Sequence, residues 1–379
     1  MAADLKEFKL ALNKLTKKYD TKTLIRNVRE ANLNSYISFS SPNLNYVLGG
    51  KFCRGRIMQL FGPESSGKST ISTFIAAEIQ KILVEEQPIV LYVDYERSFD
   101  PIYAERLGLN LDDDHFMLVQ PDTMEDGFEI IEALVKSGKI GLVIFDSETT
   151  APTRSQEESE YGKAGFGPQA KILADSLRKI NIQLAKYKTS MIVISQERDN
   201  MDVGSHAIKT TGGRALKFYA STRNRVTRVE TIEEGGETIG IKVKVRNYKN
   251  KTGIMYRDAE MTLYFDRGFD VDAEYIDFFL RLGLVVQNGA YFKSDEYGFN
   301  CQGRAKLQAW FDEHPDVFEK MKKSTLELLG KESKELDGDK QVPDEVENDK
   351  AEEEETAAAL ADLALKAAEG EEVPPDLNV

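Results

Sequence analysis

Short apolar runs, spaced by segments of helical length, dominate residues 35–270. The runs are rich in β-branched residues and almost free of polar interruption, which is typical of strands buried on both faces. They lie at 56–61, 88–96, 140–147 and 189–196. Helix-length segments such as 69–86 and 127–138 separate them, and this alternation indicates a mainly parallel sheet covered by helices. The pattern therefore predicts an α/β core domain over residues 35–270.

The periodicity then changes to two. Residues 223–231 and 239–248 form two runs joined by the turn-forming sequence EEGGE, which carries the glycines typical of a tight connection. From Ile241 to Arg246, an apolar residue alternates with a basic one. This alternation is expected of half-exposed antiparallel strands. We therefore expect the pair to extend one edge of the sheet.

Two regions follow the core domain. Residues 271–330 contain two helical stretches that flank a hairpin-like piece, which predicts a small α/β C-terminal domain. Residues 331–379 hold 17 acidic and 5 basic residues and little that could bury a face. This acidic tail is therefore predicted to be disordered.

The first 34 residues are expected to form a short helix and a linker. Apolar residues recur there at helical spacing and form one stripe. They are Leu5, Phe8, Leu12, Leu15 and Tyr19. The stripe fits either packing on the chain's own domain or docking on a neighbouring subunit. The segment lacks the apolar region of a signal peptide.

The net charge of −14 is unevenly distributed. The acidic tail carries −12 of it, which leaves −2 for the first 330 residues, so the acidic total does not exclude nucleic acid as a partner. No apolar stretch reaches the roughly 18 residues of a membrane span, and no membrane partner is predicted. Cys53 and Cys301 form no CxxC pair, which favours free thiols in a reducing compartment. The scattered histidines predict no metal site.

The sequence GPESSGKST fits the phosphate-loop pattern GxxxxGK[ST], and it lies between a predicted strand and a predicted helix. Its glycines let backbone N–H groups surround phosphates at a helix N-terminus. Lys68 is expected to reach the β- and γ-phosphates, Ser69 to bind Mg²⁺, and Thr70 to support the α-phosphate. The predicted nucleotide-binding residues of the loop are Gly62, Pro63, Glu64, Ser65, Ser66, Gly67, Lys68, Ser69 and Thr70.

Two acids downstream complete this site. Asp146 ends an apolar run, where a carboxylate can hold Mg²⁺ and its water shell. Glu96 ends another run, and an acid there can polarise the attacking water. The alternative for each is a solvated carboxylate at a strand end. Placed downstream of Lys68, the two acids favour nucleotide hydrolysis.

Further blocks follow the phosphate loop in a fixed order. They are DYERSFDPIYAERLGLN, QPDTMEDGFEIIEALVKSG, LVIFDS, ISQ, TTGGRALKFYAS and KNK. Together with GPESSGKST they resemble the bacterial RecA recombinases, and the resemblance runs from the N-terminal helix to the acidic tail. It implies a RecA-like ATPase core and a helical filament on single-stranded DNA, with ATP bound between adjacent subunits. The N-terminal stripe would then dock on the next subunit.

The resemblance also implies roles for individual residues. Glu96 becomes the catalytic base, and Asp100 and Tyr103 become adenine contacts. Gln196 would sense the γ-phosphate. Lys249 and its near neighbour Lys251 would reach the phosphates held by the adjacent subunit, although a solvated basic turn is the alternative from the residues alone.

Two loops, 154–167 and 197–212, are expected to contact DNA. The implied DNA-binding residues are Lys171, Arg178, Arg198, Met201, Val203, Ile208, Gly212, Gly213 and Arg214. Contacts of this kind to the phosphate backbone bind without reading sequence. In the C-terminal domain, Lys293, Arg304 and Lys306 are candidate contacts to a duplex, and a solvated surface is the alternative.

Some positions depart from the bacterial pattern. Arg97 stands where these proteins usually have histidine, and the second loop lacks their aromatic residue. The first loop carries three acids, Glu157, Glu158 and Glu160. Such departures are expected of a divergent branch, such as one encoded by a virus of bacteria. They leave open a role in repressor self-cleavage.

The predicted function is a DNA-dependent ATPase that uses ATP and Mg²⁺ to pair and exchange homologous strands in recombination and repair. Expected partners are single- and double-stranded DNA, further copies of the chain, and single-strand-binding and mediator proteins. The expected location is the cytoplasm of a bacterium or of a phage-infected host. A ring-forming helicase or motor with the same core fold, and a non-hydrolysing mediator on DNA, are the alternatives.

Overall fold

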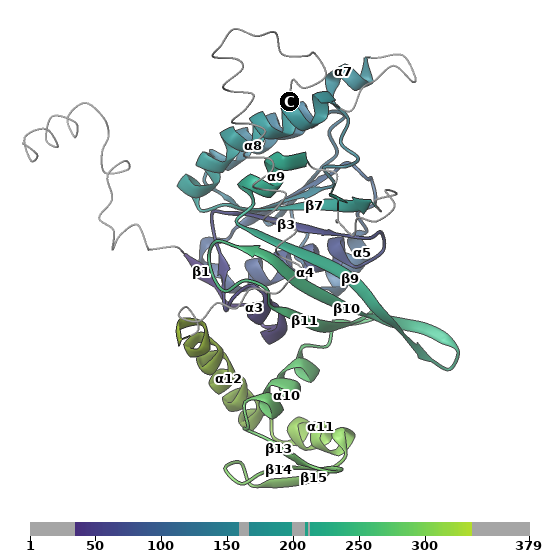
Figure 1. The fold of residues 1–379 in the computed structure, drawn as a ribbon, viewed down its shortest axis with the longest axis vertical. Coiled ribbons are helices and arrows are strands. Elements are labelled where there is room, and N and C mark those ends of the chain that lie inside the picture. The colour runs from purple at the N-terminus through teal and green to yellow at the C-terminus, as the bar shows by residue number, and fades with distance from the viewer. Residues whose placement is uncertain (1–34, 159–166, 199–208, 211–212, 336–379) are drawn as a thin grey trace, which may run out of the picture. The chain divides into compact units, whose positions relative to one another are not determined.

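The computed structural model describes residues 35–158, 167–198, 209–210 and 213–335 (Figure 1). The chain divides into two compact units, Met1–Tyr36 and Ile37–Val379. Of the first unit only residues 35 and 36 are described, so the predicted N-terminal helix lies outside the described residues. The division into an N-terminal segment (1–34), a core (35–270), a C-terminal domain (271–330) and a tail (331–379) stays a prediction.

The main sheet has ten strands among the described residues, and its central part is parallel. The order is β12-β11-β10-β9-β3-β7-β6-β4-β5, with β8 paired to β7. The parallel strands are β3 (Ile57–Gly62), β4 (Ile89–Asp94), β5 (Phe116–Val119), β6 (Ile140–Asp146) and β7 (Ser190–Arg198). The four predicted strands are thereby confirmed, and β5 is an addition that the sequence reasoning did not name.

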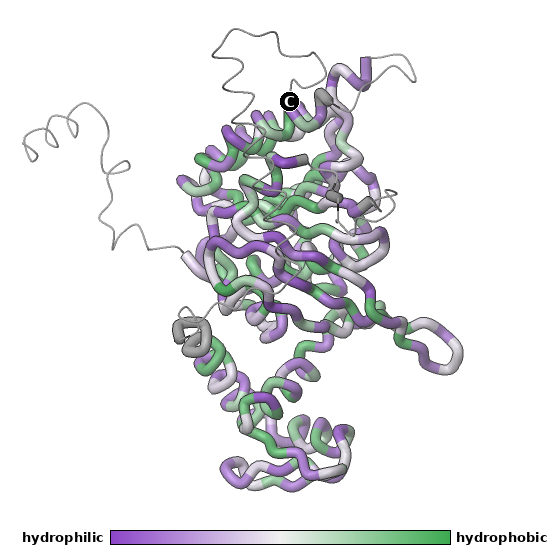
Figure 2. Tube along the Cα trace, in the orientation of Figure 1, coloured by the Kyte–Doolittle hydropathy of each residue, from purple (hydrophilic) through white to green (hydrophobic). Residues whose placement is uncertain are grey.

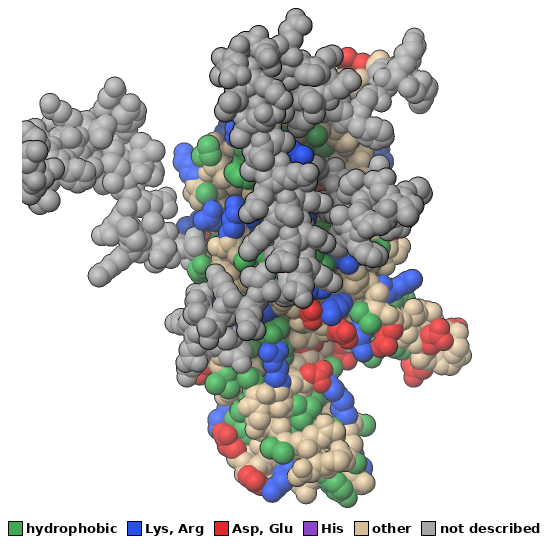
Figure 3. All heavy atoms as spheres, in the orientation of Figure 1, with side chains coloured by type: hydrophobic (Ala, Val, Ile, Leu, Met, Phe, Trp, Pro, Cys, Tyr) green, Lys and Arg blue, Asp and Glu red, His purple; other side chains and the backbone are tan. Residues whose placement is uncertain are grey.

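The predicted antiparallel extension is also present. Its strands are β9 (Thr222–Glu234), β10 (Glu237–Asn250), β11 (Asp258–Tyr264) and β12 (Gly268–Phe269). β9 runs parallel to β3 at its start and antiparallel to β10 along its length. Acidic and basic side chains are interspersed around the β9–β10 hairpin (Figure 3). Lys242 pairs with Glu230 at 2.8 Å and Lys244 with Asp258 at 3.3 Å, so these lysines of β10 have acidic partners.

Helices cover both faces of the sheet because alternate strand residues point to opposite sides. On β6, Leu142 and Ile144 join one core cluster with α4, whereas Val143 and Phe145 join another with α6 and α8. Figure 2 shows hydrophobic and hydrophilic positions interleaved along α8, as expected of a helix with one buried face. The helices of this part are α3 (Pro42–Val47), α4 (Lys68–Ile82), α5 (Pro101–Arg106), α6 (Met124–Val135), α7 (Arg154–Glu157), α8 (Gly167–Tyr187) and α9 (Gly213–Tyr219), with a 3-10 turn at Val84–Glu86.

The C-terminal region forms a separate hydrophobic cluster. Phe279 and Phe311 are both at most 1% exposed and pack with their centroids 5.7 Å apart. The elements are α10 (Val271–Arg281), β13 (Val286–Asn288), β14 (Tyr291–Ser294), β15 (Phe299–Gln302), α11 (Arg304–Glu313) and α12 (Pro315–Glu335). Two short strands, β1 (Tyr36–Ile37) and β2 (Phe52–Cys53), complete the described elements.

Some observed elements extend into the segments that were predicted as tail or loops. α12 continues to Glu335, past the predicted start of the tail. The segment 154–167 begins with α7 because Thr153 and Gln156 form a capping box, and a capping box starts a helical turn. The segment 197–212 begins inside β7 and also includes β8 (Lys209–Thr210). The rest of these segments and of the tail lies outside the described residues.

Candidate nucleotide-binding site

The phosphate loop joins β3 to α4, as predicted. β3 ends at Gly62 and α4 begins at Lys68, so the intervening residues turn into the amino end of the helix. Gly62 and Gly67 have φ angles of 151° and 93°, which glycine adopts without steric cost. A side chain at Gly62 would also overlap the carbonyl oxygen of Val226 on β9. The glycines therefore allow the loop to pass close to β9. The loop also faces the N-terminus of α4, where the helix dipole favours an anion.

Lys68 is the first residue of α4, and its side chain extends back into this loop. Its ammonium donates hydrogen bonds to the carbonyl oxygens of Gly62 at 3.0 Å and Pro63 at 2.5 Å, and to the Ser66 hydroxyl at 3.5 Å. Burial lowers the pKa of Lys68, and the nearby carboxylates, led by Asp146, act in the opposite direction. The loop thus holds a buried cation beside backbone donors, which is an arrangement suited to phosphate.

Asp146 is the most buried acid of the predicted site, at 1% exposure. Its Oδ2 accepts hydrogen bonds from the Ser69 hydroxyl and the Tyr92 hydroxyl, both at 2.7 Å. Burial raises the pKa of Asp146 to about 6, although both hydrogen bonds act to lower it. The other oxygen, Oδ1, is buried and has no hydrogen-bond partner among the described residues. A hydroxyl and an unpartnered carboxylate oxygen fit a hard cation such as Mg²⁺.

Glu96 lies beside Asp146 but not at the end of a strand. β4 ends at Asp94, so the prediction that Glu96 ends the strand was wrong. The Glu96 carboxylate accepts hydrogen bonds from Ser147 Oγ at 2.9 Å and from Gln196 Nε2 at 3.1 Å. Segments far apart in the sequence thereby meet in one hydrogen-bonded set. The structure brings Glu96 and Gln196 together, and Glu96 remains exposed.

The two predicted adenine contacts belong to one short helix. Asp100 caps the amino end of α5 by accepting a hydrogen bond from the Tyr103 backbone at 3.1 Å. Burial raises the pKa of Tyr103, and a hydrogen bond with Thr70 acts in the opposite direction. Tyr103 therefore contacts the last residue of the phosphate loop. A contact with adenine stays a prediction for both residues.

Lys249 and Lys251 lie at the carboxyl end of α9. Lys249 Nζ donates to the carbonyl oxygens of Lys217 and Phe218, and Lys251 Nζ donates to that of Phe218 at 3.3 Å. Lysines at this end of a helix satisfy carbonyl groups that have no partner within the helix. The aromatic ring of Phe218 is itself 69% exposed. A reach to a neighbouring subunit stays a prediction.

The predicted DNA-binding residues are only partly described. Lys171 and Arg178 are exposed on α8, and Arg178 forms an ion pair with Asp175 at 3.5 Å. Arg214 is exposed on α9, which begins at Gly213. For Arg198 only the backbone, at the end of β7, is described. Met201, Val203, Ile208 and Gly212 lie outside the described residues.

The C-terminal candidates are exposed and partly paired. Lys293 forms an ion pair with Asp295 at 2.7 Å, and Arg304 with Asp277 at 2.6 Å. Lys306 is also exposed. Both pairs are at the surface, where ion pairs contribute little to stability.

Sequence reasoning missed Asp94, Ser147 and Tyr92. Asp94 is 1% exposed and accepts hydrogen bonds from the Phe99 backbone at 3.2 Å and from Gln120 Nε2 at 3.0 Å. It thus holds the segment that carries Glu96 in place. An acid near the end of a predicted strand was a usable signal. Ser147 and Tyr92 gave no comparable signal, because their roles depend on pairing across β4 and β6.

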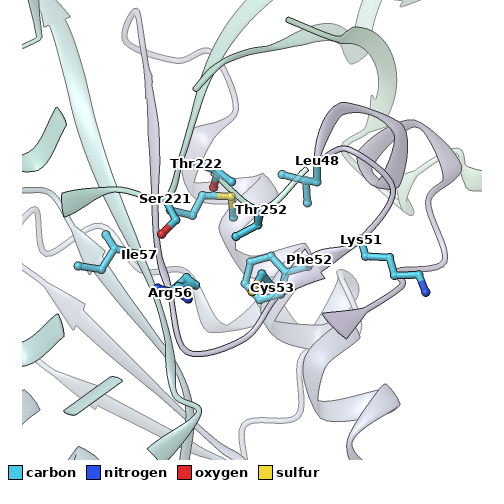
Figure 4. Close-up of a pocket in the computed structure, with 10 residues that line it drawn as sticks. Leu48, Lys51, Phe52, Cys53, Arg56, Ile57, Ser221, Thr222 and Thr252 are labelled. Carbon is cyan, nitrogen blue, oxygen red and sulfur yellow. The ribbon is translucent and has the colours of Figure 1, made fainter. Parts of the chain in front are cut away.

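A pocket outside this site lies at the other end of β3 (Figure 4). Its lining includes Ile57, where β3 begins, together with Cys53 and Arg56. None of the predicted site residues lines it. Cys53 and Cys301 are both free thiols, as predicted.

The described part of the chain holds one group of residues that could bind a metal ion. Asp112, Asp114 and His115 place one possible ligand atom each within 4.8 Å of the others, and the two acids are exposed. The sequence predicted no histidine metal site. Among the described helices, none is both long and apolar enough to cross a membrane.

Comparison with known proteins agrees with this geometry. The family model of the RecA N-terminal domain matches residues 6–270. Protein RecA of Lactiplantibacillus pentosus is 37% identical over 325 residues, which cover 84% of each chain. Protein RecA of Lactobacillus acidophilus is 34% identical over 359 residues, 93% of this chain and 96% of the relative. For Protein RecA of Bacillus thuringiensis the identity is 35% over 315 residues, 82% and 90% of the two chains. The chain therefore belongs to the RecA family.

Proposed function

We propose that this protein is a DNA-dependent ATPase that forms a helical filament on single-stranded DNA and catalyses homologous pairing and strand exchange. Membership in the RecA family supports the recombinase role. The observation that carries the proposal is the linked set of side chains beside the phosphate loop, in which Glu96 accepts a hydrogen bond from Gln196 at 3.1 Å. That bond connects the proposed catalytic acid to the strand that leads into a proposed DNA-binding segment.

The phosphate loop binds ATP in this proposal. Lys68 and the backbone N–H groups at the start of α4 hold the phosphates, and Ser69 with Asp146 holds Mg²⁺. A bound Mg²⁺ supplies neutralisation of phosphate charge. Asp100, which caps α5, and Tyr103, which lies on α5 and forms a hydrogen bond with Thr70, contact the base.

Glu96 is the proposed general base. Its carboxylate is exposed and held in place by Ser147 Oγ at 2.9 Å, so it can accept a proton from a water molecule that attacks the γ-phosphate. The Gln196 amide donates to the same carboxylate. A γ-phosphate would compete with Glu96 for this hydrogen bond. Because Gln196 lies on β7, a change in this hydrogen bond acts on the segment 197–212 that follows.

A second subunit completes the site in this proposal. Lys249 and Lys251 would exchange their hydrogen bonds to carbonyl groups of α9 for contacts to the neighbour's phosphates. Cations that reach transferring phosphoryl groups from another subunit stabilise the charge that develops there. ATP hydrolysis would therefore depend on filament assembly.

DNA and further partners complete the proposal. Exposed Lys171, Arg178 and Arg214, with the segments 154–167 and 197–212, would bind single-stranded DNA through its phosphates. The C-terminal region would dock a duplex. Single-strand-binding and mediator proteins are proposed partners, and the bacterial relatives support action in a bacterial or phage-infected cytoplasm.

Electron microscopy tests the assembly. On single-stranded DNA with a slowly hydrolysed ATP analogue, we expect helical filaments that require the nucleotide, and none for Lys68→Ala. Closed rings would instead indicate the ring-forming motor. Filaments without single-strand-stimulated ATP hydrolysis would indicate the non-hydrolysing mediator, which the linked set around Glu96 argues against.

A further inference from the structure

The buried hydroxyl of Tyr92, near the phosphate loop, has no role in the proposed binding and hydrolysis of ATP. Tyr92 lies on β4, is 3% exposed, and packs its ring against Phe99 and Phe116 with centroid distances of 4.8 and 6.5 Å. These neighbours are apolar, and a phenylalanine would satisfy them equally well. A buried tyrosine hydroxyl is costly unless it has a hydrogen-bond partner. The partner therefore indicates why the hydroxyl is there.

That partner is the carboxylate of Asp146. The Tyr92 hydroxyl donates to Oδ2 at 2.7 Å, and Ser69 Oγ donates to the same oxygen at 2.7 Å. β4 and β6 are adjacent parallel strands in which Tyr92 lies opposite Ile144, two residues before Asp146. Tyr92 thus reaches along the strand pair to the acid at the end of β6.

The two carboxylate oxygens of Asp146 differ in their hydrogen bonds. Oδ2 accepts hydrogen bonds from two hydroxyl donors, one on α4 and one on β4. Oδ1 has no hydrogen-bond partner among the described residues. Rotation of the carboxylate would break both bonds in a buried environment, where an unmade hydrogen bond is costly. The hydrogen bonds from Tyr92 and Ser69 therefore fix the orientation of the Asp146 carboxylate.

We propose that Tyr92 is a positioning residue of the metal site, whose hydroxyl orients the Asp146 carboxylate and thereby raises the affinity of the nucleotide site for Mg²⁺. The inference rests on the proposed nucleotide-binding function. Groups that hydrogen-bond a metal ligand typically change metal affinity by about 10- to 100-fold when removed. Tyr92 acts only through Asp146 and touches neither nucleotide nor water in this proposal.

The substitution Tyr92→Phe removes the hydroxyl and keeps the ring. The measurement is binding of a fluorescent ADP analogue to the full chain while Mg²⁺ is titrated, and it requires no turnover. We expect the Mg²⁺ concentration at half-maximal binding to rise about tenfold. Binding in EDTA should match that of the wild type, because the phosphate loop itself is untouched.

Tyr95→Phe is the matched control. Tyr95 also donates a hydroxyl hydrogen bond, which is partly buried, but to the Thr123 carbonyl at 2.9 Å. Its ring packs against Phe145 at a centroid distance of 5.1 Å. It therefore belongs to the opposite face of the sheet from Tyr92. Loss of its hydroxyl should leave the Mg²⁺ midpoint unchanged. An equal shift in both variants would mean that any lost tyrosine hydroxyl disturbs the site, and the inference would be overturned.

Asp146→Asn separates the failure of this inference from the failure of the proposed function. If the Mg²⁺ concentration has no effect on nucleotide binding by wild type or by Asp146→Asn, the proposed metal site is wrong. The inference about Tyr92 is then wrong as well. If Asp146→Asn shifts the Mg²⁺ midpoint but Tyr92→Phe stays within about twofold of wild type, only the role of Tyr92 is wrong. A tenfold shift in Tyr92→Phe alone among the tyrosine variants supports the inference.

Discussion

Each acid of the site is held by donors from another part of the chain. Asp146 accepts from Ser69 and Tyr92, and Glu96 accepts from Ser147 and Gln196. Charge-assisted hydrogen bonds of this kind are stronger than neutral ones. They therefore fix the position of a carboxylate even where, as at Glu96, it is exposed to solvent.

The first prediction concerns Glu96. Glu96→Gln keeps the shape of the side chain and its acceptor oxygen but cannot take a proton. We expect single-strand-stimulated ATP turnover to fall by about 10²- to 10⁴-fold, while binding of ATP and DNA persists. Glu105→Gln, an exposed acid on α5, is the control and should hydrolyse normally. Normal turnover by Glu96→Gln would remove Glu96 from the role of base.

At the scale of elements, the sequence predicted what depends on local pattern. The buried strands, the β9–β10 hairpin and the phosphate loop each carry their own signal, namely apolar runs, alternation and glycine spacing. The hydrogen bond between Glu96 and Gln196 was not predicted, because it depends on the order in which β4, β6 and β7 lie side by side in the sheet. The hydroxyl of Tyr92 could not be assigned for the same reason. The start of α7 at Arg154 was not predicted, although the capping box formed by Thr153 and Gln156 marks it.

A junction between two helices gives a prediction on pH. Glu274 of α10 is 4% exposed and accepts hydrogen bonds from Ser41 Oγ at 2.6 Å and from the Asn43 backbone at 3.3 Å. Burial raises its pKa from 4.5 to about 8, and Asp270 and Asp277 add to the rise. The folded protein therefore holds a proton that the unfolded chain releases, so the contribution of Glu274 to stability declines as the pH rises from about 4.5 to 8.

Glu274→Gln tests this sign. Glutamine keeps an acceptor oxygen for Ser41 but does not titrate. We expect the thermal unfolding midpoint of the variant, relative to wild type, to rise steadily between about pH 5.5 and 8.5. Curves that stay parallel across this range would show that Glu274 does not titrate differently in the folded and unfolded chains.

At the scale of the whole molecule, charge is divided unequally. The net charge is −14, and residues 331–379 carry −12 of it. We expect an acidic tail of this kind to compete with DNA for basic surfaces through long-range electrostatics. The competition is screened by salt over a Debye length of about 10 Å at 0.1 M.

Truncation after Glu335 tests the competition and leaves α12 intact. We expect duplex DNA to bind more tightly to the truncated chain than to the full chain, with the larger difference at low salt. Fluorescence anisotropy of a labelled duplex measures it. A tail of equal length with its acids replaced by glutamine and asparagine should behave like the truncation. Identical affinities for the full and truncated chains would rule out an electrostatic role for the tail.

ATP-dependent pairing of homologous DNA is the activity proposed for this chain. Formation of displacement loops between a labelled single strand and a supercoiled duplex tests it most directly. We predict joint molecules with wild type, ATP and a homologous strand, and none with Lys68→Ala or with a heterologous strand. Equal yields from homologous and heterologous strands, or no joint molecules under conditions in which wild type hydrolyses ATP on single-stranded DNA, would contradict the account.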